Sequence, residues 1–249
     1  MTSHFSTIGL PVASNDDFIS LANRVAEEAQ WFETPQGGYL QWSVPCGAEI
    51  WLQVNKLQEL IGMNPHFVGQ SKVRVRLTAS VDRSAASELD GAFHGWANPV
   101  DDQEMQGDYP FVFDLPNFFQ HQPLSLPQTV EVQIAAFAHE VSLFDSLEDY
   151  DAAQTGELKF ASQSFIPSGL FTSAEDQSSP PAYACFTGNI LATQRHINPL
   201  SHEPFYWALV DSLGGTFDVV IDPELITQPP KVGGILQGAF WLSGLITSL

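Results

Sequence analysis

Short runs in which apolar and polar side chains alternate recur along this chain, and they constrain its fold more than any other feature. The clearest is 71–81, where apolar residues at 73, 75 and 77 alternate with basic residues at 72, 74 and 76. Successive side chains of a strand point to opposite faces, so a period of two predicts a half-buried strand. Further β-rich runs lie at 39–44, 48–54 and 109–115, and 129–144 reads as one long or two short strands. Because helical runs do not follow each strand, the pattern excludes a doubly wound parallel sheet and predicts a β-rich α+β fold.

The closing stretch, 232–249, has no charged side chain and could be mistaken for a membrane anchor. A membrane helix needs about 20 apolar residues, and each of the four glycines here would cost a helix about 1 kcal/mol. With a period of two, Leu236, Phe240 and Leu242 share an apolar face with Gly238 and Gly244, where a curved sheet has room to bend. The stretch is therefore expected to be a closing strand.

The first part of the chain combines one helix with several strands. Residues 6–12 read as a short strand, and a helix capped by Ser14 or Asn15 is expected after it. Its apolar stripe extends at helical spacing to Ala29 and Phe32. The hairpin formed by 39–44 and 48–54 follows, so this part is expected to be a βαβββ-like sheet module.

The second half shows a different organisation. Runs 183–195, 205–213 and 216–222 read as strands, and the closing stretch adds another. Short strands with internal glycines are typical of a small OB-like or Greek-key β-barrel. Before them, Ser146 and Asp149 form a capping-box pattern that predicts a helix at 146–154. Prolines at 123 and 127 and a linker-like segment at 173–181 divide the chain into a 1–122 sheet module, a 128–172 connecting β/α segment and a 182–249 barrel.

Charge limits the partners of this protein. Nine Lys and Arg stand against 29 Asp and Glu, which gives a net charge of −20. Such a surface repels nucleic acid and anionic lipid, so neither is expected as a partner. No secretory signal is visible at the N-terminus, and the two cysteines, Cys46 and Cys185, are not arranged as a metal or redox motif. We therefore expect a cytoplasmic protein with reduced thiols.

Motifs that would announce an enzyme are missing from the sequence. It contains no G-x-G-x-x-G, no P-loop, no G-x-S-x-G and no H-E-x-x-H, since Leu143 and Tyr206 occupy the positions of the second histidine. The leading hypothesis is accordingly a soluble, acidic, non-enzymatic binding or interaction protein without a cofactor. Its partner would be a protein or a small molecule.

Two groups of residues are candidates for ligand binding. Lys72, Arg74 and Arg76 place three of the nine basic residues on one strand face, which could gather an anionic ligand. Acids on neighbouring strands could instead neutralise them. His94 and Trp96, in the aromatic turn expected at 93–99, could line a small-molecule pocket. The plainer alternative is a loop that folds its Trp back onto the sheet.

The order strand, helix, hairpin and the run "GAEIWLQV" at 47–54 give the first 80 residues a faint resemblance to the vicinal oxygen chelate (glyoxalase-type) superfamily. The resemblance implies one divalent metal held by His4, Glu49 and His66. It would make the chain a metal-dependent enzyme of glyoxalase or dioxygenase type, which is the alternative function. Two features depart from that family: Glu49 lies opposite the apolar face of its strand, and no second βαβββ copy is evident.

The second half also resembles an uncharacterised family of bacterial proteins. The segments that prompt this are "SFIPSGLF" at 164–171, "GGTFDVVIDPEL" at 214–225 and "GAFWLSGLI" at 238–246. That resemblance implies a bacterial origin and no particular activity.

Overall fold

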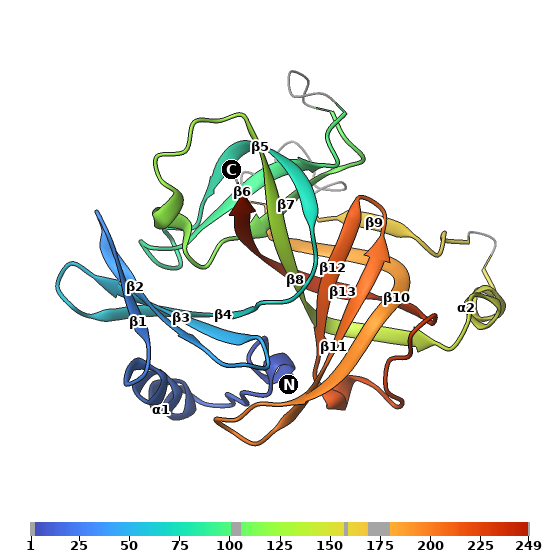
Figure 1. Ribbon diagram of the computed structural model, residues 1–249, viewed down its shortest axis with the longest axis horizontal. Helices are drawn as coiled ribbons and strands as arrows, with labels where there is room; N and C mark the ends of the chain where they lie inside the picture. Colours follow the sequence, from blue (N-terminus) through green and yellow to red (C-terminus); the bar gives the residue numbers. More distant parts are fainter. Residues whose placement is uncertain (1–2, 101–105, 157–158, 169–179, 249) are drawn as a thin grey trace.

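The computed structural model describes residues 3–100, 106–156, 159–168 and 180–248. It shows a β-rich α+β protein with a four-stranded antiparallel sheet near the N-terminus and a nine-stranded mixed sheet. Figure 1 shows the smaller sheet and its helix on one side of the molecule, with the larger sheet curving beside it. Among the described residues, no helix has the length and apolar character to cross a membrane.

The smaller sheet consists of strands in chain order, β1 (Gln30–Thr34), β2 (Gly37–Ser43), β3 (Ala48–Asn55) and β4 (Leu60–Phe67). Helix α1 (Asn15–Ala26) packs on it through Leu21, Ala22 and Val25. The helix begins at a capping box: Ser14 Oγ accepts from the Asp17 amide at 3.2 Å, and the Asp17 carboxylate accepts from the Ser14 amide at 2.9 Å.

The larger sheet has a ring-like pairing pattern. Its strands follow the order β11-β12-β8-β5-β6-β7-β13-β10-β9, and β11 also pairs with β10, and β8 with β13. β8 and β13 therefore lie in the middle of the sheet and are shared by both of its halves. The nine strands of the larger sheet are β5 (Val73–Asp82), β6 (Gly91–Ala97), β7 (Pro110–Asp114), β8 (Gln128–Phe144), β9 (Ser164–Pro167), β10 (Tyr183–Ile197), β11 (Pro204–Ser212), β12 (Gly215–Ile221) and β13 (Ile235–Ser248).

Two main apolar cores use opposite faces of the larger sheet. On β8, Ile134 and Ala136 belong to the core that the curved sheet encloses, whereas Ala135 and Phe137 belong to the core shared with α1 and the smaller sheet. This alternation explains why β8 is apolar on both faces over its central part. It is one continuous strand, which decides between the two interpretations of the 129–144 run.

Other expected elements are also present. The alternating run 71–81 is β5, and its apolar residues Val73, Val75 and Leu77 are fully buried in the enclosed core. The expected helix at 146–154 is α2 (Leu147–Ala153), which Ser146 caps through the Asp149 amide. The closing stretch is β13. Its apolar face enters the enclosed core as predicted from the period of two.

The expected strand at 6–12 is wrong. Ser6–Ile8 form a 3-10 turn that ends at Gly9, whose φ of 74° is incompatible with an extended strand. A side chain at Gly9 would also meet Glu203 O at 2.8 Å, so glycine is required for this close approach. The expected helical stripe, which extends to Phe32, is also too long. α1 ends at Ala26, and Phe32 belongs to β1, where it pairs with Tyr39. The N-terminal module is therefore a helix followed by four strands, not βαβββ.

Four strands were not expected from the sequence: β1, which the helical stripe covered; β4, which contains Asn64-Pro65; β6, which covers most of the expected aromatic turn; and β9. β6 carries two glycines and pairs closely with β5, since a side chain at Gly95 would come within 2.5 Å of Val75 Cγ1. In the sequence, the glycines of β6 resemble a turn signal. In the structure they allow the two strands to pack closely and do not form a bend.

The strands of 182–249 do not pair only with one another. β12 pairs in parallel with β8, and β13 pairs with β8 along most of its length. The larger sheet thus includes a strand from the 128–172 segment, and the division of the chain into domains stays a prediction. Most of the linker expected at 173–181 lies outside the described residues.

Candidate functional site

A layer of buried polar side chains joins the two sheets. His66 on β4 is fully buried. Its Nδ1 lies 2.8 Å from Ser243 Oγ on β13, and its Nε2 lies 2.9 Å from Gln133 Oε1 on β8. Burial lowers the pKa of His66 from 6.5 to about 4, so the ring is neutral at pH 7. A neutral imidazole has one donor and one acceptor, so Nε2 donates to the Gln133 carbonyl and Nδ1 accepts from the Ser243 hydroxyl.

The same layer contains a buried carboxylate, Asp218 on β12, which is 0% exposed. It accepts hydrogen bonds from the Gln70 amide at 2.9 Å, the Ser71 amide at 2.8 Å, Gln133 Nε2 at 2.7 Å and the Trp207 indole at 2.8 Å. Four donors compensate for the loss of water around the charge. Asp218 therefore fixes the β4–β5 connection to the larger sheet.

Ser243, His66, Gln133 and Asp218 form a chain of side-chain types that a hydrolytic enzyme could use. In such an enzyme the serine oxygen faces a substrate. Here Ser243 is 1% exposed and His66 is 0% exposed, and neither lines the cavity described next. A serine that no substrate reaches cannot act as a nucleophile. This set of four side chains is therefore a structural connection between the sheets.

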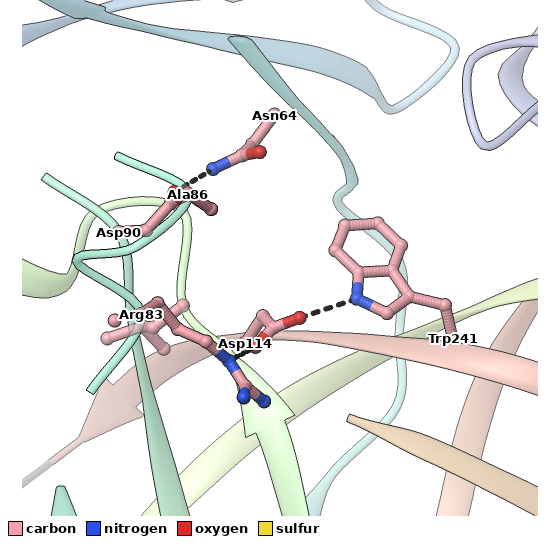
Figure 2. Close-up of a pocket in the computed structure, with 8 residues that line it drawn as sticks. Asn64, Arg83, Ala86, Asp90, Asp114 and Trp241 are labelled. Atoms are coloured by element: carbon pink, nitrogen blue, oxygen red, sulfur yellow. Dashed lines mark hydrogen bonds and ion pairs between the residues drawn. The ribbon is translucent and has the colours of Figure 1, made fainter. Parts of the chain in front are cut away.

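A cavity of about 140 Å³ opens at the junction of the two sheets. Asn64 on β4 lines one side, Arg83 and Asp90 come from the β5–β6 loop, Asp114 ends β7, and Trp241 lies on β13. Figure 2 shows these side chains converging from four separate parts of the chain. Junctions of this kind are frequent places for small ligands.

Asp114 is held between two donors. The Trp241 indole Nε1 donates to its Oδ2 at 2.6 Å, and Arg83 Nε donates to its Oδ1 at 3.0 Å. Burial raises the pKa of the Asp114 carboxyl, although both donors act in the opposite direction and Asp90 adds to the rise. A carboxylate in this environment is stabilised by additional positive charge.

Asp90 is bound differently from Asp114. Gln53 Nε2 and Asn64 Nδ2 both donate to its Oδ1, the second at 2.7 Å. In the part of the chain that the structure describes, no hydrogen-bond donor contacts Asp90 Oδ2. Carboxamides are neutral, so they orient the Asp90 carboxylate without cancelling its charge.

Trp241 presents its edge to the cavity. Its ring stacks on His4 with centroids 4.3 Å apart and planes 7° apart, and Phe137 lies 4.9 Å away at a tilt. Since these rings occupy its surroundings and its N–H is bound to Asp114, Trp241 is a rigid wall rather than a stacking platform. Among the lining residues that the structure describes, the charged ones are Asp90, Asp114 and Arg83, which together carry a formal charge of −1.

The basic residues predicted to bind a ligand lie elsewhere. Lys72 forms an ion pair with Glu131 on β8 at 3.3 Å, as the neutralising alternative expects. Arg74 Nη1 donates to Pro99 O at 3.1 Å. Arg76 is only 7% exposed, and its Nη1 donates to Thr129 Oγ1 at 3.2 Å. None of these three lines the junction cavity.

His94 and Trp96 lie on β6, not in a turn. His94 Nδ1 lies 2.7 Å from Thr78 Oγ1, and burial lowers the pKa of its imidazole. Trp96 is the register partner of Arg76 on β5. The structure therefore brings Trp96 and Arg76 to one face of the sheet, away from the lining of the cavity.

The structure does not assemble the metal ligands that the glyoxalase-type resemblance implies. Glu49 and His66 are register partners on β3 and β4. However, Glu49 accepts hydrogen bonds from Gln41 Nε2 at 2.8 Å and Trp51 Nε1 at 3.0 Å, while His66 binds the larger sheet. His4 contacts a different histidine, His139. Within the described ranges, no three His, Cys, Asp or Glu side chains are grouped as metal ligands would be.

Sequence reasoning missed most of the cavity. Arg83 follows the basic run at 72–76 and Trp241 belongs to the closing stretch, but neither position indicates a cavity. Asp114 lies near the end of the β-rich run 109–115, where polar residues are common, whereas Asp90 precedes β6, which the sequence does not identify as a strand. Their separation along the chain leaves no local signal that they meet.

Compared with family models, curated proteins and solved structures, the chain matches none. The resemblances to the vicinal oxygen chelate superfamily and to an uncharacterised bacterial family accordingly remain predictions.

Proposed function

We propose that this chain is a non-enzymatic, cytoplasmic binding protein whose ligand is a small cation carrying a primary ammonium group, held in the junction cavity. One observation carries the proposal: among the described residues that line the cavity, two are carboxylates, Asp90 and Asp114, and one is a guanidinium, Arg83. The excess of one negative charge favours a cationic ligand over a neutral or anionic one.

The way each carboxylate is bound supports this choice. Asp114 is already bound to Arg83 and Trp241, so it forms part of the rigid wall. Asp90 keeps one oxygen, Oδ2, without a donor among the described residues, and its other oxygen is fixed by Gln53 and Asn64. An ammonium group donates up to three hydrogen bonds. It would compensate the charge of Asp90, with the Asn64 carbonyl oxygen as a further acceptor.

The charge of the whole protein acts in the same direction. A net charge of −20 attracts small cations to the surface and raises their concentration near an acidic cavity. The alternative function, a metal-dependent glyoxalase or dioxygenase-type enzyme, lacks its implied ligand group in the described residues. We also retain the OB-like, Greek-key description of 182–249 as a proposal, supported by the antiparallel pairing of β10 with β11 and β13.

Calorimetry with methylammonium and ethanolamine as probes, and acetate as the anionic control, tests this function. We expect the two amines to bind at one site and acetate not to bind. The affinity should fall as salt is added, because the attraction between charges is screened. The Asp90→Asn variant keeps the shape of the side chain and removes its charge, so it should lose binding.

Asp145→Asn is the matched control, since Asp145 is an exposed carboxylate that pairs with Lys231 away from the cavity. This variant should bind both amines as the unmodified protein does. If the unmodified protein binds neither amine, or if Asp90→Asn binds them unchanged, the proposed function is wrong.

A further inference from the structure

The imidazoles of His4 and His139 meet at the edge of the core that the larger sheet shares with α1 and the smaller sheet, outside the junction cavity. Their Nε2 atoms are 3.0 Å apart, their ring centroids are 4.9 Å apart and their planes are nearly perpendicular at 83°. His4 comes from the segment before α1, and His139 lies on β8, so the fold alone brings the two rings together. Both side chains are partly exposed, which leaves the pair accessible to small ions.

His139 occupies a special position on its strand. In the pairing of β8 with β13, Ala239 is opposite Glu140 and Phe240 is opposite Ala138, so His139 is the extra residue of a β-bulge. A bulge of this kind redirects a side chain and interrupts the ladder, and bulges are frequent beside functional sites. Here the bulge lies at the residue that contacts His4.

The ring of His4 is held by stacking, and its backbone is held by a hydrogen bond. It stacks in parallel on Trp241, with a centroid distance of 4.3 Å. Its backbone carbonyl accepts from Thr7 Oγ1 at 2.8 Å. On the other side of the pair, the His139 ring lies 5.2 Å from the Tyr183 ring. Histidine side chains held by packing in this way lose little conformational freedom when an ion binds.

We propose that His4 and His139 form a two-histidine site for a divalent transition-metal ion of tetragonal geometry, Cu²⁺ or Ni²⁺. Imidazole nitrogens bind such ions at about 2.0–2.1 Å, and two nitrogens 3.0 Å apart then subtend an angle of about 91–97° at the metal. A right angle is typical of tetragonal Cu²⁺ and Ni²⁺ sites. Tetrahedral Zn²⁺ would need the nitrogens about 3.4 Å apart.

Without a metal, the 3.0 Å distance lets one ring donate a hydrogen bond to the other. Metal binding replaces this bond, because both Nε2 atoms must then present lone pairs to the ion. The remaining coordination positions would be filled by water or a small exogenous ligand, since no third His, Cys, Asp or Glu joins the pair among the described residues. This site does not depend on the proposed cation cavity, and the two can fail separately.

The test uses the full chain, purified without an affinity tag or chelator and titrated with Cu²⁺ alone. Electron paramagnetic resonance should show one tetragonal Cu²⁺ per chain with hyperfine structure from two nitrogens. The His139→Gln variant should weaken binding by more than about tenfold, because loss of an outer-shell partner alone causes about that much.

His202→Asn is the matched control. His202 is exposed in a turn at a φ of 65°, a conformation that asparagine tolerates. This variant should bind Cu²⁺ like the unmodified protein. If His139→Gln fails to fold, substoichiometric Cu²⁺ added to the unmodified protein keeps the proposal testable, since the paramagnetism of Cu²⁺ should broaden the imidazole resonances of His4 and His139 first. Equal Cu²⁺ binding by both variants, or broadening that spares these two rings, would overturn the site.

Discussion

At the scale of single residues, the buried polar layer between the sheets depends on Asp218. Its carboxylate accepts four hydrogen bonds, two from backbone amides and two from side chains. Asp218→Ala removes every acceptor at once and leaves these donors unpaired. We expect the free energy of unfolding to fall by more than about 3 kcal/mol, measured by urea denaturation, because each buried unsatisfied group costs about 1–3 kcal/mol.

The control for this loss is Asp145→Ala. Asp145 forms an ion pair with Lys231 at 3.2 Å, and their side chains are 52% and 65% exposed. Exposed pairs contribute at most about 1 kcal/mol, so this variant should remain close to the unmodified protein. Similar losses for the two aspartates would contradict the role assigned to Asp218.

His66 makes the stability of the protein depend on pH. Its pKa is about 4 in the folded protein and 6.5 when exposed by unfolding, so between these values the unfolded chain binds more protons. The stabilisation from neutral His66 is therefore complete above pH 6.5 and is lost as the pH falls toward 4. The gap corresponds to roughly 3 kcal/mol.

This dependence can be measured by urea unfolding at several pH values between 7.5 and 4.5. Burial lowers the pKa of His4 too, which adds to the acid loss, whereas it raises the pKa of Glu49 and Asp114. The contribution of these two carboxyls has the opposite sign, being present at low pH and lost as the pH rises through their folded pKa. In His66→Asn the loss between pH 6.5 and 4.5 should be smaller. Parallel profiles for the two proteins would show that His66 is not its source.

At the scale of elements, β13 is a central strand of the larger sheet, shared by both of its halves. Phe240 is fully buried and stacks on Phe186 with centroids 4.1 Å apart, whereas Gln237 is only partly buried. Phe240→Asp should unfold the larger sheet, since even removal of a buried Phe side chain costs about 3–5 kcal/mol and a buried unpaired charge costs more. Gln237→Lys should change stability by about 0.5 kcal/mol or less. Thermal melting of both variants compares them, and equal melting temperatures would overturn the assignment of the two faces.

Helix α1 should depend on its cap. Ser14 accepts from the Asp17 amide, and Ser14→Ala removes that bond at a cost of about 1 kcal/mol. Ser20→Ala is the control in the same helix, because Ser20 is exposed in the helix interior, where alanine is the better helix former. Urea denaturation should show a loss for the first variant and none for the second.

At the scale of the whole molecule, the ring-like pairing couples parts of the chain that the sequence pattern separates. β8, from residues 128–144, pairs with both β12 and β13. We expect a fragment of residues 128–249 to melt cooperatively, because it keeps β8 between its partners. A fragment of residues 182–249 should stay unfolded, since β12 and β13 lose that shared strand. Circular dichroism and thermal melting of both fragments check this expectation. A cooperative melt of 182–249 alone would instead support the independent barrel predicted from the sequence.

Local sequence patterns identified several of the extended segments and the buried face of each. Val73, Val75 and Leu77 on β5 and Phe240 on β13 lie in the core as the period of two predicts. Helix α2 is capped by Ser146 and begins at Leu147, as its capping pattern predicts. These features are local, because the side-chain period and the cap depend on residues only a few positions apart. Local patterns failed where one signal has two meanings, as in β6, whose glycines allow close strand packing rather than a turn.

Which distant residues meet follows from the tertiary fold and not from local sequence patterns. Asp90 and Asp114 line one cavity, and His4 reaches His139 across 135 positions of chain. His66, which a resemblance placed at a metal, connects the two sheets through Gln133 and Ser243. Periodicity specifies the face of a strand but not its neighbour, since pairing depends on the register and order of strands far apart in sequence. Both candidate sites proposed among the described residues lie where distant segments of the chain meet, so their composition became visible only in the folded chain.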